Sequence, residues 1–144
     1  MITSRSLDDL APFVKVKALD HIKRCRDAGI DLLIYCTYRD TEAQNELYKH
    51  GRTISGAVLT FAKGGDSWHQ WRVAYDCVPV RNGKPIWTQN NDADRLLWER
   101  VGAIGEACGL QWSGRWTGAM REMAHFEDTK GLTIAQIKKI GGFV

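Results

Sequence analysis

The sequence lacks the features that mark membrane and secreted proteins. No apolar run approaches the ~20 residues of a membrane-spanning helix. The start, MITSRSLDDLAP, has no apolar stretch of the kind found in a secretory signal. We therefore expect that the protein does not insert stably into a membrane and that it is synthesised in the cytoplasm. If it acts outside the cytoplasm, another factor must release it.

Strong charge is also missing. The net charge is +3, from 20 basic and 17 acidic residues, and the basic residues are scattered along the chain. A dedicated nucleic-acid binder carries a basic patch or stripe. The balance therefore argues against a nucleic-acid partner.

The four cysteines form no CxxC pair. Cys25, Cys36, Cys77 and Cys108 are 11, 41 and 31 residues apart, so no closely spaced pair can clamp a metal or run redox chemistry. We expect them to be small buried side chains rather than disulfides.

What is present fits one domain over residues 1–144, which we expect to be a monomer. The chain is 44% hydrophobic, and a chain of 144 residues can bury a substantial core. Apolar residues at helical spacing from Leu7 to Cys25 predict a first helix that Gly29 ends, and 31–37 reads as a buried strand. Thr41 and Gln44 have capping-box spacing for a second helix.

Later segments add further elements. After a glycine-rich loop at 52–66, alternation predicts a strand from Trp71 to about Val80, followed by an Asn82-Gly83 turn. A helix capped near Asn91, a loop at 111–118, a short strand at 123–127 and a last helix after Thr133 complete the chain. Helices and strands do not alternate regularly, which predicts an α+β fold with a small, mainly antiparallel sheet flanked by helices.

Two segments concentrate residues suited to metal chemistry. They read SWHQWRVAYD (67–76) and REMAHFE (121–127). A catalytic zinc takes three protein ligands and leaves a fourth position for water, while a separate carboxylate can accept a proton. His69, Asp76 and His125 can be the ligands and Glu122 the base. Taken singly, each has a more ordinary interpretation: a histidine is usually structural, and an aspartate at a strand end is usually a solvated turn residue.

The zinc hypothesis imposes a shape on the first segment. On a straight strand, seven residues at about 3.3 Å each would separate His69 from Asp76 by roughly 23 Å and put them on opposite faces. The chain must therefore bend between Gln70 and Val73. In the second segment, a turn ending near Met123 would place Glu122 beside the metal. Glu127 would then share a strand face with His125 and hold its second ring nitrogen.

Four segments in order resemble the zinc D-alanyl-D-alanine peptidases and the phage L-alanyl-D-glutamate endopeptidases, which share the hedgehog-type fold. SWHQWRVAYD is similar to their SxHxxGxAxD signature and EMAHFE to their ExxH element. TYRDTEAQNELYKHGR and GLQWSGRW resemble two further family segments. The resemblance covers about 37–127.

The resemblance implies specific roles. It makes His69, Asp76 and His125 the zinc ligands and Glu122 the catalytic base. It also makes Arg39, Ser67 and Gln44 substrate-binding residues; Arg39 acts in catalysis either by holding a substrate carboxylate or by neutralising the oxyanion. Two departures stand out: Arg72 stands where the family has glycine, and Ala124 stands where a proline often precedes the final histidine, which is the milder change. Because arginine adopts a positive φ only with strain, we expect the bend to use ordinary dihedrals or to shift to a neighbour.

The implied function is zinc-dependent hydrolysis of the peptidoglycan stem peptide between L-Ala and D-Glu. The resemblance is to single-domain, antimicrobial endolysins of bacteriophages, which reach the cell wall or periplasm through a separate membrane lesion. One alternative is a D-Ala-D-Ala carboxypeptidase or dipeptidase. Another is a non-catalytic binding module stabilised by zinc, against which the presence of Glu122 argues.

Overall fold

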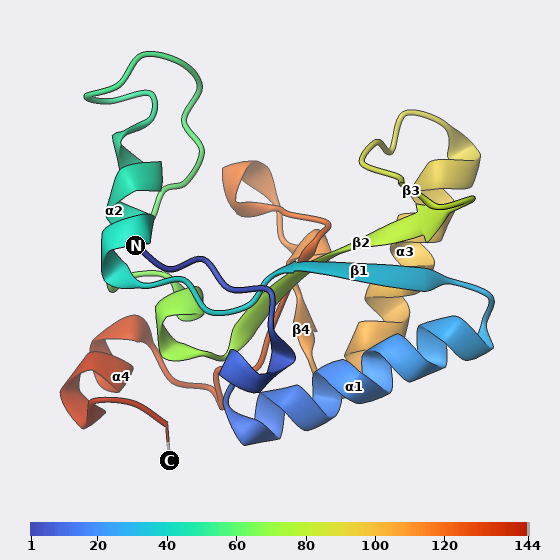
Figure 1. Cartoon of the computed structure of the whole chain (residues 1–144), viewed down its shortest axis with the longest axis horizontal. Helices are drawn as coiled ribbons and strands as arrows, with labels where there is room; N and C mark the ends of the chain where they lie inside the picture. The colour runs from blue at the N-terminus through green and yellow to red at the C-terminus, as the bar shows by residue number, and fades with distance from the viewer. Residues whose placement is uncertain (144) are drawn as a thin grey trace.

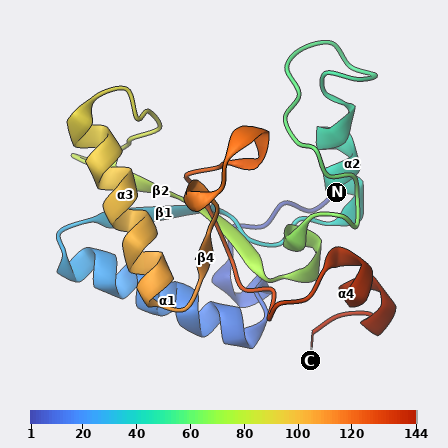
Figure 2. The same cartoon turned by 180° about the vertical axis from the view of Figure 1, so that it is seen from behind.

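A five-stranded antiparallel sheet with helices against it forms the molecule (Figures 1 and 2). The computed structural model describes residues 1–143. The strands run in the order β1-β2-β5-β4, and β3 also pairs with β2. The α+β class and the mainly antiparallel sheet are therefore confirmed. The elements are α1 Pro12–Asp27, β1 Asp31–Cys36, α2 Thr41–Lys49, β2 Ala74–Arg81, β3 Lys84–Pro85, α3 Asp92–Ala107, β4 Gln111–Trp112, β5 His125–Glu127 and α4 Ile134–Ile140.

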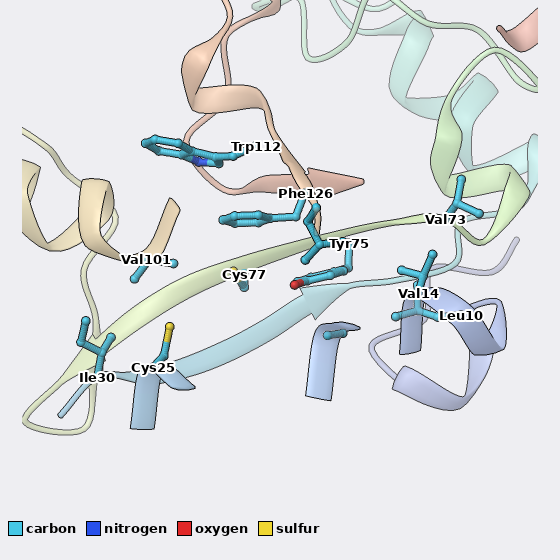
Figure 3. Close-up of a cluster of buried hydrophobic side chains, with 12 residues drawn as sticks. Leu10, Val14, Cys25, Ile30, Val73, Tyr75, Cys77, Val101, Trp112 and Phe126 are labelled. Carbon is cyan, nitrogen blue, oxygen red and sulfur yellow. The ribbon is translucent and has the colours of Figure 1, made fainter. Parts of the chain in front are cut away.

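The two faces of β2 and β5 serve different purposes. Tyr75, Cys77 and Phe126 point to one face, where α1 and α3 cover them (Figure 3). Asp76 and His125 are paired across β2 and β5 and point to the other face. The period-2 alternation of strands thus places the core and the predicted ligands on opposite sides of the same strands.

Close packing of α3 on the sheet depends on two glycines. A Cβ added at Gly102 would lie 2.3 Å from the Trp112 ring, and one at Gly105 would lie 2.4 Å from Phe126. Gly105 also lies beside His21 of α1, which is fully buried. Small residues at these positions let α3 approach the aromatic core closely. The close packing of α3 fixes the position of the sheet.

Several local predictions are confirmed. Gly29 ends the first helix at a φ of 80°, and Asn82 and Gly83 adopt positive φ in the turn between β2 and β3. Asn91 caps α3 through a hydrogen bond that its side chain accepts from the Asp94 amide. Thr133 opens α4 with a capping box.

Other boundaries differ from the predictions. The first helix begins at Pro12, because 7–9 form a separate 3₁₀ turn capped by Ser6. Asp40, and not Thr41, caps α2, because its carboxylate accepts a hydrogen bond from the Ala43 amide. The capping box predicted at Thr41 and Gln44 is therefore wrong.

The chain between α2 and β2 was predicted as a loop, and 52–66 contain no helix or strand. The strand predicted to begin at Trp71 begins at Ala74, since 68–71 form a 3₁₀ helix. The four cysteines are free, and three of them are buried, as expected. None of the helices in residues 1–143 is long and apolar enough to cross a membrane.

Candidate metal centre and catalytic cleft

The bend predicted before Asp76 is present. Trp68–Trp71 form a 3₁₀ helix, and Arg72 follows with φ 65° and ψ 24°. Ser67 caps this helix by accepting a hydrogen bond from the His69 amide. The chain then enters β2, so that His69 Nε2 lies 3.4 Å from Asp76 Oδ2.

The expectation about the dihedrals of the bend is wrong, because Arg72 itself takes the left-handed conformation. Contacts of its side chain offset the strain of a positive φ. The guanidinium lies 3.8 Å from the centre of the Tyr38 ring and donates a hydrogen bond to the Asp9 carbonyl. The Arg72 carbonyl accepts a hydrogen bond from the Ala11 amide. Glycine is therefore not required where the surrounding chain holds the turn.

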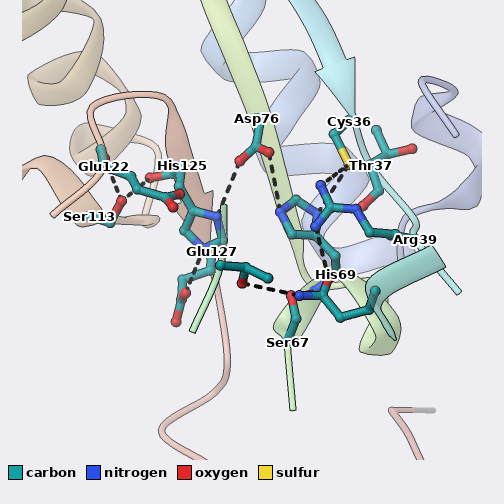
Figure 4. Close-up of polar contacts among 12 residues, drawn as sticks. Cys36, Thr37, Arg39, Ser67, His69, Asp76, Ser113, Glu122, His125 and Glu127 are labelled. Atoms are coloured by element: carbon teal, nitrogen blue, oxygen red, sulfur yellow. Dashed lines mark hydrogen bonds and ion pairs between the residues drawn. The ribbon is translucent and has the colours of Figure 1, made fainter. Parts of the chain in front are cut away.

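The second segment also has the predicted form. Met123 and Ala124 make a turn, and His125 is the first residue of β5, paired with Asp76. His125 Nδ1 lies 3.2 Å from Asp76 Oδ1. The structure thus brings His69, Asp76 and His125 together, with Asp76 between the two rings (Figure 4).

The remaining nitrogen of each ring is occupied by a protein acceptor. His69 Nδ1 lies 2.8 Å from the Thr37 carbonyl oxygen and donates to it. His125 Nε2 lies 2.8 Å from Glu127 Oε1 and donates to that carboxylate. Each bond orients its ring so that the other nitrogen faces Asp76, the usual arrangement of metal-binding histidines. Glu127 thus lies where the strand geometry predicted.

The donor set suits a zinc ion. Ligands about 2.05 Å from a tetrahedral ion lie roughly 3.3 Å apart, and His69 Nε2 and His125 Nδ1 lie 3.4 and 3.2 Å from the two different oxygens of the Asp76 carboxylate. Donor atoms within 4.8 Å of one another form two groups that share Asp76: one with Cys36 and His69, the other with Glu122 and His125. Two imidazoles and one carboxylate form a donor set typical of catalytic zinc. All three residues are at least nine-tenths buried.

The ionisable side chains of this cluster strongly shift one another's pKa values. Burial alone lowers the pKa of His69, but the Asp76 carboxylate outweighs it and raises the pKa to about 10. The pKa of His125 is raised to about 9, where burial is again outweighed by its hydrogen bonds to Asp76 and Glu127. Burial raises the pKa of Asp76, yet the two histidines hold it well below its usual range. A bound divalent cation can replace the protons of the two histidines as the positive charge that the carboxylates of Asp76 and Glu127 stabilise.

Cys36 is a close neighbour that sequence reasoning missed. Its sulfur lies 3.7 Å from His69 Nδ1, the nitrogen bonded to Thr37. Cys36 Sγ, a nitrogen of His69 and an oxygen of Asp76 all lie within 4.8 Å of one another, so Cys36 is a further side chain that could hold a metal ion. A β-bulge between Ile34 and Cys36 sets Cys36 opposite Asp76. No spacing in the sequence signals this bulge.

Glu122 lies beside the cluster in a more exposed position. A carboxylate oxygen of Glu122, an oxygen of Asp76 and a nitrogen of His125 all lie within 4.8 Å of one another. Ser113, which was not predicted, is fully buried and donates hydrogen bonds to the carbonyls of Glu122 and His125 (Figure 4). Glu122 is thus within reach of a water molecule at the cluster.

Arg39 lies on the other side of His69, at the start of α2 (Figure 4). It donates to Gln44 Oε1 at 2.9 Å and to Cys36 Sγ at 3.3 Å. Its Nε is buried and has no partner among residues 1–143. Arg39 and Ser67 both line a cleft of about 990 Å³ that also reaches Glu122 and His125.

Gln44 is not among the residues that line this cleft. It is fully buried, accepts from Arg39 and donates to Thr60 and the Ala62 carbonyl. Its side chain is engaged within the protein, and its contact with substrate stays a prediction. Gln44 fixes Arg39 and ties the loop at 52–66 to α2.

The arrangement is typical of a hydrolase: buried side chains that could hold a metal ion lie at an open cleft, with a carboxylate and an arginine beside them. A family model described as D-alanyl-D-alanine carboxypeptidase matches residues 60–128. The peptidoglycan L-alanyl-D-glutamate endopeptidase CwlK of Bacillus subtilis (strain 168) is 35% identical over 124 residues, which cover 83% of this chain and 73% of that protein. The chain belongs to the peptidase M15 family, and it is a metallopeptidase that hydrolyses peptide bonds.

Solved structures share the fold. The Serratia marcescens L-Ala D-Glu endopeptidase ChiX superposes with a TM-score of 0.61 at 19% identity, over 89% of each chain. The vancomycin resistance D,D-pentapeptidase VanY, in complex with Zn(II), superposes with a TM-score of 0.60 at 15% identity, over 92% of this chain and 80% of that chain. These likenesses match the predicted α+β architecture.

Proposed function

We propose that this protein is a zinc-dependent peptidoglycan hydrolase that cleaves the bond between L-alanine and D-glutamate. The observation that carries the proposal is the meeting of His69 and His125 at Asp76, whose two carboxylate oxygens lie 3.4 Å from His69 Nε2 and 3.2 Å from His125 Nδ1 in the wall of an open cleft. The 35% identity to an L-alanyl-D-glutamate endopeptidase supports the choice of bond. Residues 1–144 would form one catalytic domain that acts as a monomer.

His69, Asp76 and His125 would hold the zinc ion through Nε2, a carboxylate oxygen and Nδ1. When bound, zinc supplies Lewis acidity that activates a water molecule for attack at neutral pH. Glu122 accepts the proton of the attacking water and passes it to the leaving amine. Glu127 and Thr37 keep the two imidazoles in the required tautomers.

Arg39 would bind the substrate carboxylate next to the scissile bond. In the stem peptide, D-glutamate continues through its γ-carboxyl group, so its α-carboxylate is free beside the scissile nitrogen. The partnerless Nε of Arg39 supports this role, since a buried donor without an acceptor costs about 1–3 kcal/mol until a ligand supplies one. Gln44 and Cys36 hold the guanidinium in place for that contact.

A D-Ala-D-Ala carboxypeptidase is the second candidate, favoured by the family model over 60–128. Its substrate also has a free carboxylate beside the scissile nitrogen, so Arg39 alone does not separate the two activities. Mass spectrometry of digested peptidoglycan separates them. A free L-alanine carboxyl group on the muramoyl side supports the endopeptidase, whereas released D-alanine with intact L-Ala–D-Glu bonds contradicts it.

Dependence on metal is tested with the same substrate. We expect purified protein to clear peptidoglycan, to lose this activity on treatment with a chelator, and to regain it with zinc. Full activity in protein shown by elemental analysis to contain no metal would contradict the zinc assignment.

An endolysin role is a further part of the proposal, supported by the resemblance to phage endopeptidases. Expression inside a bacterium should leave the cells intact until the cytoplasmic membrane is permeabilised. Lysis should then follow for the native protein and not for Glu122→Ala. Equal lysis by both proteins would contradict this role.

A further inference from the structure

An aromatic pair stands at the end of the cleft remote from α2. Tyr35 of β1 and Trp87, in the segment between β3 and α3, both line the cleft. Their rings meet edge to face, with centroids 5.1 Å apart and an interplanar angle of 72°. The loop at 52–66 lies beside α2, on the side of the molecule away from the segment between β3 and α3 (Figures 1 and 2).

The surrounding structure positions both residues of this pair in the cleft wall. Leu32 and Ile34 of β1 pack against the core, whereas Tyr35, which stands at the bulge between Ile34 and Cys36, lines the cleft. The backbone before Trp87 is held on both sides: the Ile86 amide donates to the Pro79 carbonyl, and the Ile86 carbonyl accepts from the Trp98 indole. The Trp87 ring is therefore well anchored although it is 54% exposed.

The polar atoms of the pair are not used by the fold. The Tyr35 hydroxyl and the Trp87 indole nitrogen have no hydrogen-bond partner among residues 1–143. Burial and the neighbouring carboxylates Asp76 and Glu122 raise the pKa of Tyr35 above its usual value, so the hydroxyl stays protonated and can donate. An exposed aromatic surface with unused donors at the rim of a cleft is typical of a ligand-binding surface.

The direction of the substrate chain in the cleft indicates which part of the substrate meets Tyr35 and Trp87. If Arg39 binds the α-carboxylate of D-glutamate, the acyl part of the substrate must run from the metal centre away from Arg39. The segment between β3 and α3, which carries Trp87, lies on the side of the molecule away from α2 and the chain that precedes it (Figure 1), so the acyl part would approach Tyr35 and Trp87. In an L-Ala–D-Glu bond the acyl residue is the first of the stem, so the sugar ring begins about 7 Å from the scissile carbon, whereas three more residues intervene in a D-Ala–D-Ala bond.

We propose that Tyr35 and Trp87 form a subsite for the N-acetylmuramoyl sugar on the acyl side of the scissile bond. The inference rests on the proposed L-Ala–D-Glu specificity. The C–H face of the pyranose ring packs on the Trp87 indole and buries apolar surface there. The Tyr35 hydroxyl donates a hydrogen bond to a polar group of the sugar or its lactoyl link.

The test compares two substrates with the same scissile bond. One is the stem peptide L-Ala-γ-D-Glu-diaminopimelate with an N-acetyl group on L-alanine, and the other carries N-acetylmuramoyl there instead. We expect kcat/KM of the native protein to be at least about tenfold higher for the muramoyl substrate. Trp87→Ala should bring the ratio of the two kcat/KM values close to one, and Trp87→Phe should restore part of it. Tyr35→Phe should lower the ratio about two- to threefold.

Phe61→Ala is the matched control, because Phe61 also lines the cleft, is 56% exposed, and lies in the loop at 52–66. It should leave the substrate ratio at the native value. Thermal melts of every variant check that the fold is retained.

The outcomes separate the subsite from the proposed function. A native protein that cuts both substrates with equal kcat/KM, or a folded Trp87→Ala protein that keeps the native ratio, overturns the subsite alone. A native protein that cuts neither substrate but releases D-alanine from a pentapeptide overturns the proposed function and the subsite with it.

Discussion

The floor and the rim of the cleft are built by different means. On the floor, His69, Asp76 and His125 are at least nine-tenths buried, and each imidazole is fixed by a second hydrogen bond. On the rim, Glu122 is exposed and Trp87 is 54% exposed. The contrast indicates that the metal-binding geometry is set by folding, whereas the groups that meet substrate keep the access to solvent that binding and proton transfer require.

The largest test of this contrast is His125→Ala on the floor. It removes one of three proposed ligands, so we expect loss of bound zinc and of at least about 10³-fold in kcat/KM. Elemental analysis and peptidoglycan digestion measure the two effects. A folded variant that still binds one zinc tightly would show that His125 is not a ligand.

Glu122→Gln tests the rim. We expect kcat to fall by about 10²- to 10⁴-fold, because the amide cannot accept the proton of the attacking water. Zinc content should stay at the native level, which sets this variant apart from His125→Ala. Native-like turnover by the folded, zinc-loaded variant would remove Glu122 from the mechanism.

Glu127→Gln tests the support beneath the floor. The carboxylate accepts a hydrogen bond from His125 Nε2 at 2.8 Å. Its neutral replacement weakens the orientation and basicity of the imidazole, so zinc affinity should fall about 10- to 100-fold. Competition with a chromophoric chelator gives the affinity, and the control is Glu106→Gln, which alters an exposed ion pair with Arg115. Equal affinity in both variants would mean that Glu127 has no part in the site.

Substitutions of Arg72 test the bend that brings His69 close to Asp76. Arg72→Ala keeps the positive φ but loses the contacts with Tyr38 and Asp9, so the free energy of unfolding should fall by about 1–2 kcal/mol. Arg72→Gly loses the same contacts but relieves the strain, and its loss should be smaller by about 1 kcal/mol. Urea denaturation measures both, and a glycine variant less stable than the alanine variant would contradict this account.

His21 gives the smallest expected effect, on the core beneath the sheet. Its Nε2 donates to the Val101 carbonyl and its Nδ1 accepts from the Tyr75 hydroxyl, so it is held neutral and burial lowers its pKa below 6.5. The unfolded chain binds a proton near pH 6.5 and the folded chain only at lower pH. Stability should therefore fall as the pH drops below 6.5, by up to about 1.4 kcal/mol per pH unit.

The measurement for His21 is the difference between the native protein and His21→Gln, both loaded with zinc, in urea denaturation from pH 7 to pH 5. The native protein should lose more stability than the variant over this range. Parallel pH profiles would show that His21 does not titrate on unfolding.

Much of the fold was predictable because local patterns and tertiary packing agree. Alternation along 73–77 separates the core side chains from Asp76, and Asn91 and Thr133 cap their helices as their spacing predicts. Where a local pattern and tertiary packing disagree, tertiary packing determines the structure. Gln44 has the spacing of a capping residue, but its amide is used to hold Arg39 and the loop at 52–66, and Asp40 caps the helix.

The sequence by itself determined the chemistry of the site: two imidazoles and two carboxylates in an order that requires a bend before Asp76. Only the tertiary structure decided how that bend is made and what stands beside the metal centre. Arg72 adopts a left-handed conformation because Tyr38 and Asp9 hold its side chain. Cys36 lies beside His69 and Asp76 because of a bulge in β1. Both features depend on contacts between residues more than 30 positions apart, which spacing along the chain does not encode.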